Sequence, residues 1–341
     1  MESAIYLVSF AKAFFVSILL TGAFVWISRK LKSKKINRIW NIQGVSRLGG
    51  VAIILAFLFS ILSASNLFIS SRLWIIIVTA LFILAVGLLD DFWKLSWKIQ
   101  LLFQLIIAIF VFAYGLRIEY ITNLWSNKLI FLNVNSIYYF LSFLLTAGWI
   151  LIMINSMNWL DGIDGLSGGV TFIASIVMFF LILKPEVNQP SVGLISMALS
   201  GSVLGFLLFN FHPSKILAGT AGAFFMGFIL AVLAIFAGTK IATTLLVMTI
   251  PVFDFVWVIL ERIRLKKSIF EGDTSHLHYK LSKLGFSPSK ISLPLYGITI
   301  LIGFIALNTR VIGKIITIFS VCAILLLTYF WIQQKLETGK K

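Results

Sequence analysis

Residues 72–94 read RLWIIIVTALFILAVGLLDDFWK, an apolar run that ends on two adjacent aspartates. Within this stretch Arg72 is the only charged residue before Asp90. Residues 72–89 are therefore apolar enough, and also long enough, for a helix to cross the hydrocarbon core of a bilayer. Backbone groups in lipid must form hydrogen bonds within their own segment, which favours a helix over a strand. The stretch predicts a membrane helix whose end carries a carboxylate pair.

The composition of the whole chain agrees with this pattern. The 341 residues are 60% hydrophobic and 12% charged, whereas soluble globular domains are about 25% charged. This composition excludes a water-soluble multidomain enzyme and a disordered chain, and the single cysteine, Cys322, excludes a disulfide scaffold. The net charge of +16 would indicate nucleic acid as a partner of a soluble protein. Here the basic residues lie between apolar runs, so we predict anionic membrane lipids and anionic substrates, and no nucleic acid.

Ten other runs resemble residues 72–89 in length and composition. We therefore predict an all-α, polytopic integral membrane protein with about eleven spans, in which residues 1–341 form a single membrane-embedded domain. Only a short turn around Asn308 separates the last two runs, so ten spans are the alternative. The eleven runs cover residues 4–27, 48–65, 72–89, 98–116, 137–157, 165–183, 192–210, 215–237, 241–260, 290–308 and 311–332.

The basic residues predict the orientation. The loop after the first span holds seven of them between Arg29 and Arg47, and the loop after the ninth span holds seven between Arg262 and Lys290. Cytoplasmic loops carry the excess of lysine and arginine. The N-terminus is therefore predicted outside and the C-terminus in the cytoplasm, with cytoplasmic loops at about residues 28–47, 90–98, 158–164, 211–215 and 261–289.

Most of the twelve acidic residues are predicted at this same side. A carboxylate at the centre of a membrane helix costs about 3 kcal/mol. A solvated helix end or a salt bridge would explain one such residue, whereas eight favour a polar active site. Clustered carboxylates beside basic residues suit a divalent cation that bridges phosphates. The eight are Asp90, Asp91, Asp161, Asp164, Asp254, Glu261, Glu271 and Asp273.

The most specific segment runs from Asn155 to Leu166. Asn155 and Asn158 share one face of a helix at i, i+3. Two Asp-Gly steps, at Asp161 and Asp164, then break the helix and allow a ligand to approach the backbone closely. A polar interhelical turn is the alternative, but so many polar residues and glycines in one short stretch favour a ligand site. The Asp90–Asp91 pair alone is weaker, because many helices end in one.

Two later segments add further candidates. Gly219 and Gly222 follow Pro213, and this segment read alone favours small packing residues over a ligand site. His276 and His278 are spaced i, i+2, so an extended chain presents both on one side. No cysteines or further histidines complete a zinc site around them, which favours imidazole donors to a phosphate or sugar.

In this order, the segments resemble the polyprenyl-phosphate N-acetylhexosamine-1-phosphate transferase family (MraY/WecA-like, glycosyltransferase family 4). The resemblance extends from about Arg47 to Leu281, and the eleven-span plan also fits. The matching pieces are Arg47-Leu48-Gly49-Gly50, Asp90-Asp91 with Ser96 and Gln100 downstream, Asn155 to Leu166, Asn210 with Pro213 and Lys215, Asp254, and His276-Leu277-His278.

The resemblance implies a phosphoglycosyl transferase of a bacterial-type cytoplasmic (inner) membrane, with its site on the cytoplasmic face. Such an enzyme transfers N-acetylhexosamine-1-phosphate from a UDP-sugar to polyprenyl phosphate, such as undecaprenyl phosphate, and releases UMP. This is the first membrane step of a cell-envelope glycan. The family uses Mg²⁺, with Mn²⁺ as an alternative, and a homodimer is a family expectation.

The resemblance also implies roles for individual residues. Asp90 would accept or position the proton of the lipid phosphate, with Asp91 assisting, and whether an aspartate attacks covalently stays open. The residues implied at the nucleotide and diphosphate are Asn155, Asn158, Asp161, Asp164 and Lys94. Those implied near the sugar or phosphates are Asp254, Arg264, His276, His278 and Arg47.

The chain departs from the family pattern at a metal ligand. The family has Phe-Met-Gly-Asp-x-Gly-Ser where residues 217–223 read LAGTAGA, so Thr220 replaces the aspartate that binds magnesium. A neutral hydroxyl is a much weaker magnesium ligand than a carboxylate. Either Asp91, Asp161 or Asp164 binds the metal instead, or the donor diphosphate carries it, or catalysis is lost. A second departure is Tyr279, where related members often have a third histidine.

Two other functions are weighed against the transferase. A catalytically silent member would bind lipid phosphate or nucleotide sugar, and Thr220 distinguishes it from the active enzyme. A transporter or flippase would explain charges within the membrane. Its acids would lie at the midplane, however, whereas here they are predicted at one face.

Overall fold

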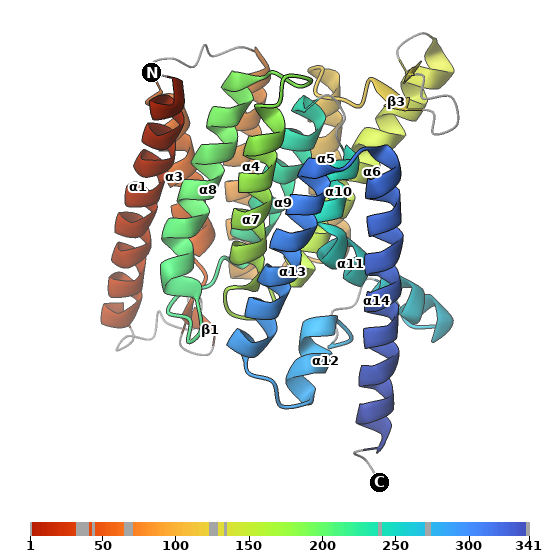
Figure 1. The fold of residues 1–341 in the computed structure, drawn as a ribbon. Coiled ribbons are helices and arrows are strands. Elements are labelled where there is room, and N and C mark those ends of the chain that lie inside the picture. The colour runs from red at the N-terminus through yellow and green to blue at the C-terminus, as the bar shows by residue number, and fades with distance from the viewer. Residues whose placement is uncertain are drawn as a thin grey trace.

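The predicted all-α architecture is confirmed. The computed structural model of the chain describes residues 2–31, 41–42, 45–64, 71–122, 129–132, 135–237, 241–269 and 274–338. Within these residues the fold is a bundle of helices with two small antiparallel hairpins, β1–β2 and β3–β4 (Figure 1). The elements are α1 (Glu2–Leu31), β1 (Asn41–Ile42), β2 (Val45–Ser46), α3 (Gly49–Leu62), α4 (Ser71–Trp93), α5 (Trp97–Ala113), β3 (Tyr120–Thr122), β4 (Leu129–Phe131), α6 (Ser136–Leu160), α7 (Leu166–Ile182), α8 (Pro190–Asn210), α9 (Gly219–Phe236), α10 (Ile241–Val247), α11 (Thr249–Arg264), α12 (Leu277–Lys283), α13 (Pro288–Asn308) and α14 (Val311–Thr338).

Each predicted apolar run coincides with a helix, with one difference. The run 241–260 is broken into α10 and α11, which meet at an angle of 80°. The Thr249 hydroxyl donates to the carbonyls of Leu245 and Leu246 and so satisfies the end of α10, and Pro251 lies in the first turn of α11, where its missing N–H is harmless. Seven helices in the described part of the chain are long and apolar enough to cross a membrane, and α3, α5 and α7 are shorter. The count of eleven spans stays a prediction.

Helix α9 lies at the centre of the bundle. Its residues are buried from Gly219 to Ile235, and α3, α4, α6 and α8 are among the helices that surround it. Small residues permit this packing: a Cβ on Gly50 would lie 2.2 Å from the backbone nitrogen of Gly222, and one on Gly87 would lie 2.2 Å from the Cα of Ala221. The N-terminus of α9 is thereby fixed against the ends of α3 and α4.

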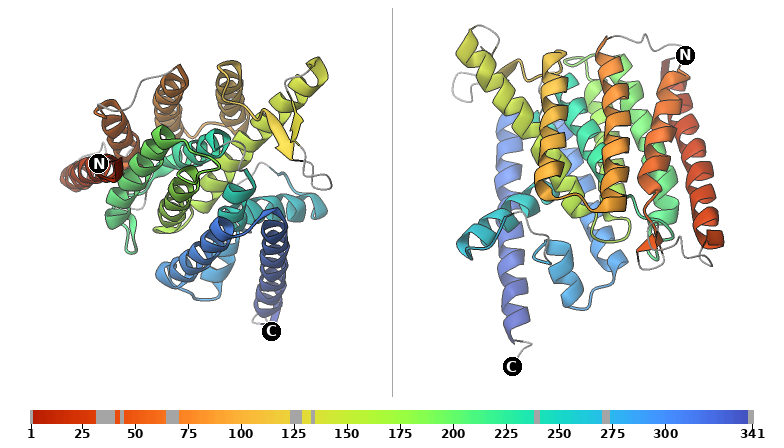
Figure 2. Two further views of the ribbon diagram at one scale, coloured as in Figure 1. Left: turned by 45° about the horizontal axis from the view of Figure 1, so that its top comes forward. Right: turned by 180° about the vertical axis from the view of Figure 1, so that it is seen from behind.

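The two chain termini lie at opposite ends of the bundle (Figure 1). The end that carries the C-terminus also carries β1 and α12, and Figure 2 shows the same arrangement from behind. The described residues of the predicted cytoplasmic loops belong to this end. Two of the acids predicted there, Glu271 and Asp273, lie outside the described residues.

Candidate active site

The carboxylate pair meets the N-terminus of α9. Asp90 and Asp91 occupy the last turn of α4, and each is only 8% exposed. The backbone N–H of Thr220 donates to both oxygens of Asp91 at 3.1 Å, and its hydroxyl donates to Oδ2 of Asp90 at 2.5 Å. A helix N-terminus stabilises negative charge, since its first N–H groups have no partner within the helix. Thr220 therefore contacts both carboxylates at once.

Gly219 is required by this contact. Its φ of +67° lies in the left-handed region, and a Cβ there would lie 2.5 Å from Oδ2 of Asp91 and 2.8 Å from the carbonyl oxygen of Arg47. Helix packing alone therefore does not explain why residue 219 is a glycine, because the Asp91 carboxylate also requires it. The Arg47 Nη1 lies 3.3 Å from Oδ1 of Asp91 and forms an ion pair with it.

Asp90 accepts two more hydrogen bonds, one from the turn that follows it and one from α5. The Leu95 N–H donates to Oδ1 at 2.9 Å, and Nε2 of Gln100, on α5, donates to the same oxygen at 2.8 Å. Lys94 forms the turn with a φ of +49°, and its side chain is exposed. Oδ2 of Asp90 has one donor against the two of Oδ1, so it is the oxygen better able to accept a proton.

The loop between α6 and α7 lies beside the pair. The Ser167 hydroxyl donates to Asp161 at 2.5 Å. Asp164 accepts from the Ser214 N–H at 3.1 Å, and Nδ1 of His212 lies 2.7 Å from the same oxygen. The predicted ligand loop is therefore tied to the segment that leads into α9.

Gly165 fixes the far end of this loop. Its φ is +77°, its N–H donates to the Asn210 side chain at 3.0 Å, and its carbonyl accepts from the Tyr296 hydroxyl at 2.5 Å. Asn210 also donates to the carbonyl of Ile216 at 2.8 Å. Neither partner of Gly165 was predicted as a site residue, although Asn210 is among the residues that match the family.

Asp161 is electrostatically linked to the carboxylate pair. The pKa of Asp161 is raised to about 7, mainly by burial and also by the charges of Asp91 and Asp164, while the Ser167 hydrogen bond and the charge of Arg47 act in the opposite direction. Asp161 and Asp91 therefore oppose each other's ionisation. Such a pair is suited to a cationic or proton-sharing ligand.

We expect this pKa to appear in the stability of the protein. The pKa of Asp161 is higher in the folded than in the unfolded chain, so the protonated side chain stabilises the fold at low pH, and this contribution is lost as the pH rises through about 7. The wild type should have a lower Tm at pH 8 than at pH 6, and Asp161→Asn should reduce that difference. Thermal unfolding in detergent measures it. An unchanged pH dependence in the variant would contradict the assignment.

A buried cluster of His276, Asp254 and Tyr329 lies at α11, α12 and α14. Nδ1 of His276 lies 2.7 Å from Oδ2 of Asp254, whose Oδ1 accepts from the Leu277 N–H at 2.8 Å and from the Tyr329 hydroxyl. The His276 ring packs edge-on against Trp159 at 4.9 Å between centroids. Asp254 thus orients the His276 ring through this contact.

His278 extends the cluster toward the ligand loop. Its ring stacks on that of His276 at 5.7 Å, and its Nε2 is buried with no hydrogen bond to any described residue. A Cβ on Gly162 would lie 2.3 Å from this atom and 2.6 Å from the Tyr279 hydroxyl. Burial lowers the pKa of His278 to about 4, so its ring is neutral near pH 7.

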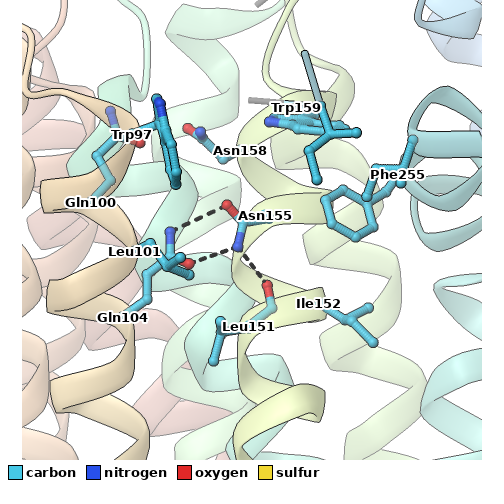
Figure 3. A pocket seen from close by; sticks show the side chains of 12 residues that line it. Trp97, Gln100, Leu101, Gln104, Leu151, Ile152, Asn155, Asn158, Trp159 and Phe255 are labelled. Carbon is cyan, nitrogen blue, oxygen red and sulfur yellow. Dashed lines mark hydrogen bonds between the residues drawn. The ribbon is translucent and has the colours of Figure 1, made fainter. Parts of the chain in front are cut away.

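A cavity of about 220 Å³ opens between α5, α6 and α11 (Figure 3). Gln100, which donates to Asp90, is among the residues that line it. Asn155 lies at its wall and forms a reciprocal amide pair with Gln104, at 2.6 and 3.2 Å. Asn158 also lines it, together with the aromatic rings of Trp97, Trp159 and Phe255 (Figure 3). Most of the lining is apolar, with amide groups on one side.

One predicted residue lies apart from the site. Arg264 is exposed at the end of α11. Arg262, two residues earlier, is 2% exposed, and its guanidinium lies 5.1 Å from the centroid of the Trp159 ring. Hydropathy and spacing do not distinguish the two arginines. Arg262, Tyr329, Tyr296 and Ser167 were not predicted as site residues.

The side chains do not fit a magnesium ion held by the protein alone. No three His, Cys, Asp or Glu side chains among the described residues are placed to share a cation. In the predicted ligand set, Asp91 is bound by Thr220 and Arg47, and Asp164 is turned to His212 and Ser214. Mg²⁺ requires near-octahedral oxygen ligands, so most of them would have to come from outside the protein.

Known proteins share this combination of elements. The model of glycosyl transferase family 4 matches residues 73–238, which include the carboxylate pair, the ligand loop and α9. A probable undecaprenyl-phosphate N-acetylglucosaminyl 1-phosphate transferase of Bacillus subtilis is 29% identical over 84% of this chain and 78% of its own. The decaprenyl-phosphate N-acetylglucosaminephosphotransferase of Mycobacterium leprae is 31% identical over 73% of this chain and 69% of its own.

A third relative extends the match to almost the full length. The phospho-N-acetylmuramoyl-pentapeptide-transferase of Halalkalibacterium halodurans is 28% identical over 91% of this chain and 99% of its own. This chain therefore belongs to glycosyl transferase family 4 and is a multi-pass membrane phospho-sugar transferase.

Proposed function

We propose that this protein transfers an N-acetylhexosamine-1-phosphate from a UDP-sugar to a polyprenyl phosphate. The products are a polyprenyl-diphospho-sugar and UMP. The observation that carries the proposal is the meeting of Asp90 and Asp91 with Thr220 at one end of the bundle, beside the loop that holds Asp161. The relatives, named as transferases of this kind, support the choice of both substrates.

The reaction forms one phosphorus–oxygen bond and breaks another. An oxygen of the lipid phosphate attacks the phosphorus that bears the sugar, and UMP leaves with the oxygen that bridged the two phosphates. If the lipid phosphate arrives protonated, Oδ2 of Asp90 is the acceptor that the hydrogen bonds leave most open. Asp91 forms an ion pair with Arg47, which fixes the position of the second carboxylate beside Asp90.

The cavity between α5 and α11 suits the acceptor end of the reaction. Its rings and aliphatic side chains match an isoprenoid chain, and one of its amides, Gln100, also donates to Asp90. A lipid phosphate seated there would approach Asp90 from α5. The UDP-sugar would then enter by the loop of Asp161 and Asp164 and the cluster of His276 and His278.

The site faces the cytoplasm of a bacterial-type inner membrane in this proposal. The seven basic residues from Arg29 to Arg47 support this orientation, since cytoplasmic loops carry the excess of lysine and arginine. The donor diphosphate would supply most of the ligands of a Mg²⁺ or Mn²⁺ ion, because Asp90, Asp91 and Asp161 accept hydrogen bonds from residues of the protein. A homodimer stays a family expectation.

The test is UMP release by the purified protein in detergent. It uses undecaprenyl phosphate, Mg²⁺ and a panel of UDP-N-acetylhexosamines, and mass spectrometry identifies the lipid product. Release of UMP that requires both the lipid and one UDP-sugar supports the proposal. Release without the lipid would identify a hydrolase, and silence with every donor would contradict the proposal for these substrates.

A silent family member is the second candidate, because Thr220 satisfies Asp90 without a metal. The two candidates are expected to differ in how they bind Mn²⁺. Electron paramagnetic resonance measures the concentration of free Mn²⁺, and the bound fraction follows by difference. The active enzyme should retain Mn²⁺ only when the UDP-sugar is present. Thr220→Asp should retain Mn²⁺ without the sugar. A wild type that binds the UDP-sugar, releases no UMP and gains activity in Thr220→Asp would establish the silent member.

The hydroxyl of Thr220 should contribute measurably to the rate. Thr220→Val keeps the backbone N–H bonds to Asp91 and removes only the hydroxyl that donates to Asp90, so we expect UMP release to fall about tenfold, as for one hydrogen bond to a charged group. Thr220→Ser keeps the hydroxyl and is the matched control. Equal rates for the valine and serine variants would show that the hydroxyl is dispensable.

A further inference from the structure

Tyr329 lies on α14, far along the chain from the carboxylate pair, within a run that reads as ordinary membrane helix. Its side chain is 2% exposed, and its hydroxyl donates to Oδ1 of Asp254 on α11. The ring packs against Trp257 at 5.4 Å, and the Lys280 ammonium of α12 lies 4.8 Å from its centroid. Three helices therefore meet at this one tyrosine.

Asp254 has a complete set of donors. It is 3% exposed, and a buried carboxylate must be compensated by hydrogen bonds. The Leu277 N–H and the Tyr329 hydroxyl both donate to Oδ1, which leaves Oδ2 for His276. The two donors on Oδ1 fix the plane of the carboxylate, and the plane fixes the direction from which Oδ2 accepts.

The carboxylate in turn selects the proton position on His276. An ionised carboxylate can only accept, so the 2.7 Å contact puts the imidazole proton on Nδ1. Nε2 of His276 then carries the lone pair in the neutral ring, because the contact with Asp254 uses Nδ1. The ring is held between Trp159 and His278, so it cannot turn to exchange the two nitrogens without disturbing both.

We infer that Tyr329 is a positioning residue of the active site, which acts through Asp254 to hold His276 in the tautomer protonated on Nδ1. This keeps Nε2 presented as one defined group to the substrates, and that part of the inference rests on the proposed function. The tyrosine does not touch the reacting atoms. Its role is to make one orientation and one protonation pattern of His276 dominant.

The chain offers an unusually simple spectroscopic test, because it holds only three histidines. Selective ¹⁵N-histidine labelling in detergent or nanodiscs gives separate resonances for protonated and unprotonated ring nitrogens. His276→Gln assigns the signals. In the wild type, His276 should show a protonated Nδ1 and an unprotonated Nε2. In Tyr329→Phe, which keeps the ring and its packing, the second tautomer should become visible.

The matched control is Tyr139→Phe. Tyr139 accepts a hydrogen bond from Arg117 at 3.0 Å, far from His276, and its loss should leave the three histidines unchanged. An Nε2-protonated His276 in the wild type would overturn the inference without any variant, and so would a Tyr329→Phe spectrum identical to the wild type. Asp254→Asn should disturb His276 more strongly than Tyr329→Phe.

Kinetics provide the second readout. Tyr329→Phe should lower kcat about tenfold, the size of one lost hydrogen bond to a charged group, with KM for the UDP-sugar nearly unchanged. A merely structural tyrosine would lower the yield of folded protein and leave kcat per folded molecule the same, which would overturn the inference. Because the histidine spectrum needs no turnover, failure of the proposed reaction and failure of this inference are distinguishable.

Discussion

Asp90→Asn is expected to lower UMP release by about 10²–10⁴-fold, the range that loss of a general base produces. The side chain is buried and accepts from Leu95, Gln100 and Thr220, so all its neighbours are donors. An asparagine would direct its own N–H₂ group at one of these donors and leave a buried hydrogen bond unmade. The rate loss therefore combines the missing base with a displaced side chain.

Glu186→Gln is the matched control for this variant. It is also an acid-to-amide change, at an exposed residue beyond the other end of α7. It should keep the wild-type rate and the wild-type Tm. If Asp90→Asn kept more than a small part of the activity, the proton-accepting role of Asp90 would be excluded. If Asp90→Asn lowered the Tm as well as the activity, the hydrogen bonds of Asp90 would instead mainly maintain the fold.

Gly219→Ala is expected to abolish most activity although it adds one methyl group. The new Cβ would lie 2.5 Å from Oδ2 of Asp91 and 2.8 Å from the Arg47 carbonyl oxygen. Asp91 or the start of α9 must move, and a displacement of about 1 Å at reacting groups costs about 10²-fold in rate. UMP release and Tm, measured together, separate this displacement from unfolding.

Gly115→Ala isolates the contact from the backbone strain. Gly115 also has a left-handed φ, +87°, but a Cβ there would meet nothing within 4 Å. Both variants carry the cost of a left-handed residue, about 1–2 kcal/mol. Only Gly219→Ala crowds the carboxylate, so equal activity of the two variants would contradict the close packing at Asp91.

The sequence was sufficient for the architecture because hydropathy dominates it. Each long apolar run became a helix, since lipid leaves the backbone no other partner. The break at Met248 was missed because the run 241–260 is continuously apolar, and the bend depends on Thr249 and Pro251. A hydroxyl in an apolar run gives no sign of whether it bonds its own helix or another one.

The candidate site was predictable where polar residues stand out from an apolar background. Asp90, Asp91 and Asp161 are such residues, and the fold brings them together. Arg262 and Arg264 could not be distinguished, because the rotation of α11 decides which of them is buried. Tyr329 could not be found either, because an aromatic residue in a membrane helix is ordinary and only its contact with Asp254 is specific.

The central place of α9 also orders the biogenesis of the protein. Asp90 and its partner Thr220 are separated by 130 residues, which a ribosome adds in roughly 7–26 s at about 5–20 residues per second. Throughout that interval α4 already exists, and its two carboxylates lack the N-terminus of α9 that later donates to them. A chain that stops before Gly219 never gains the two donors of Thr220, so the site is completed late in synthesis.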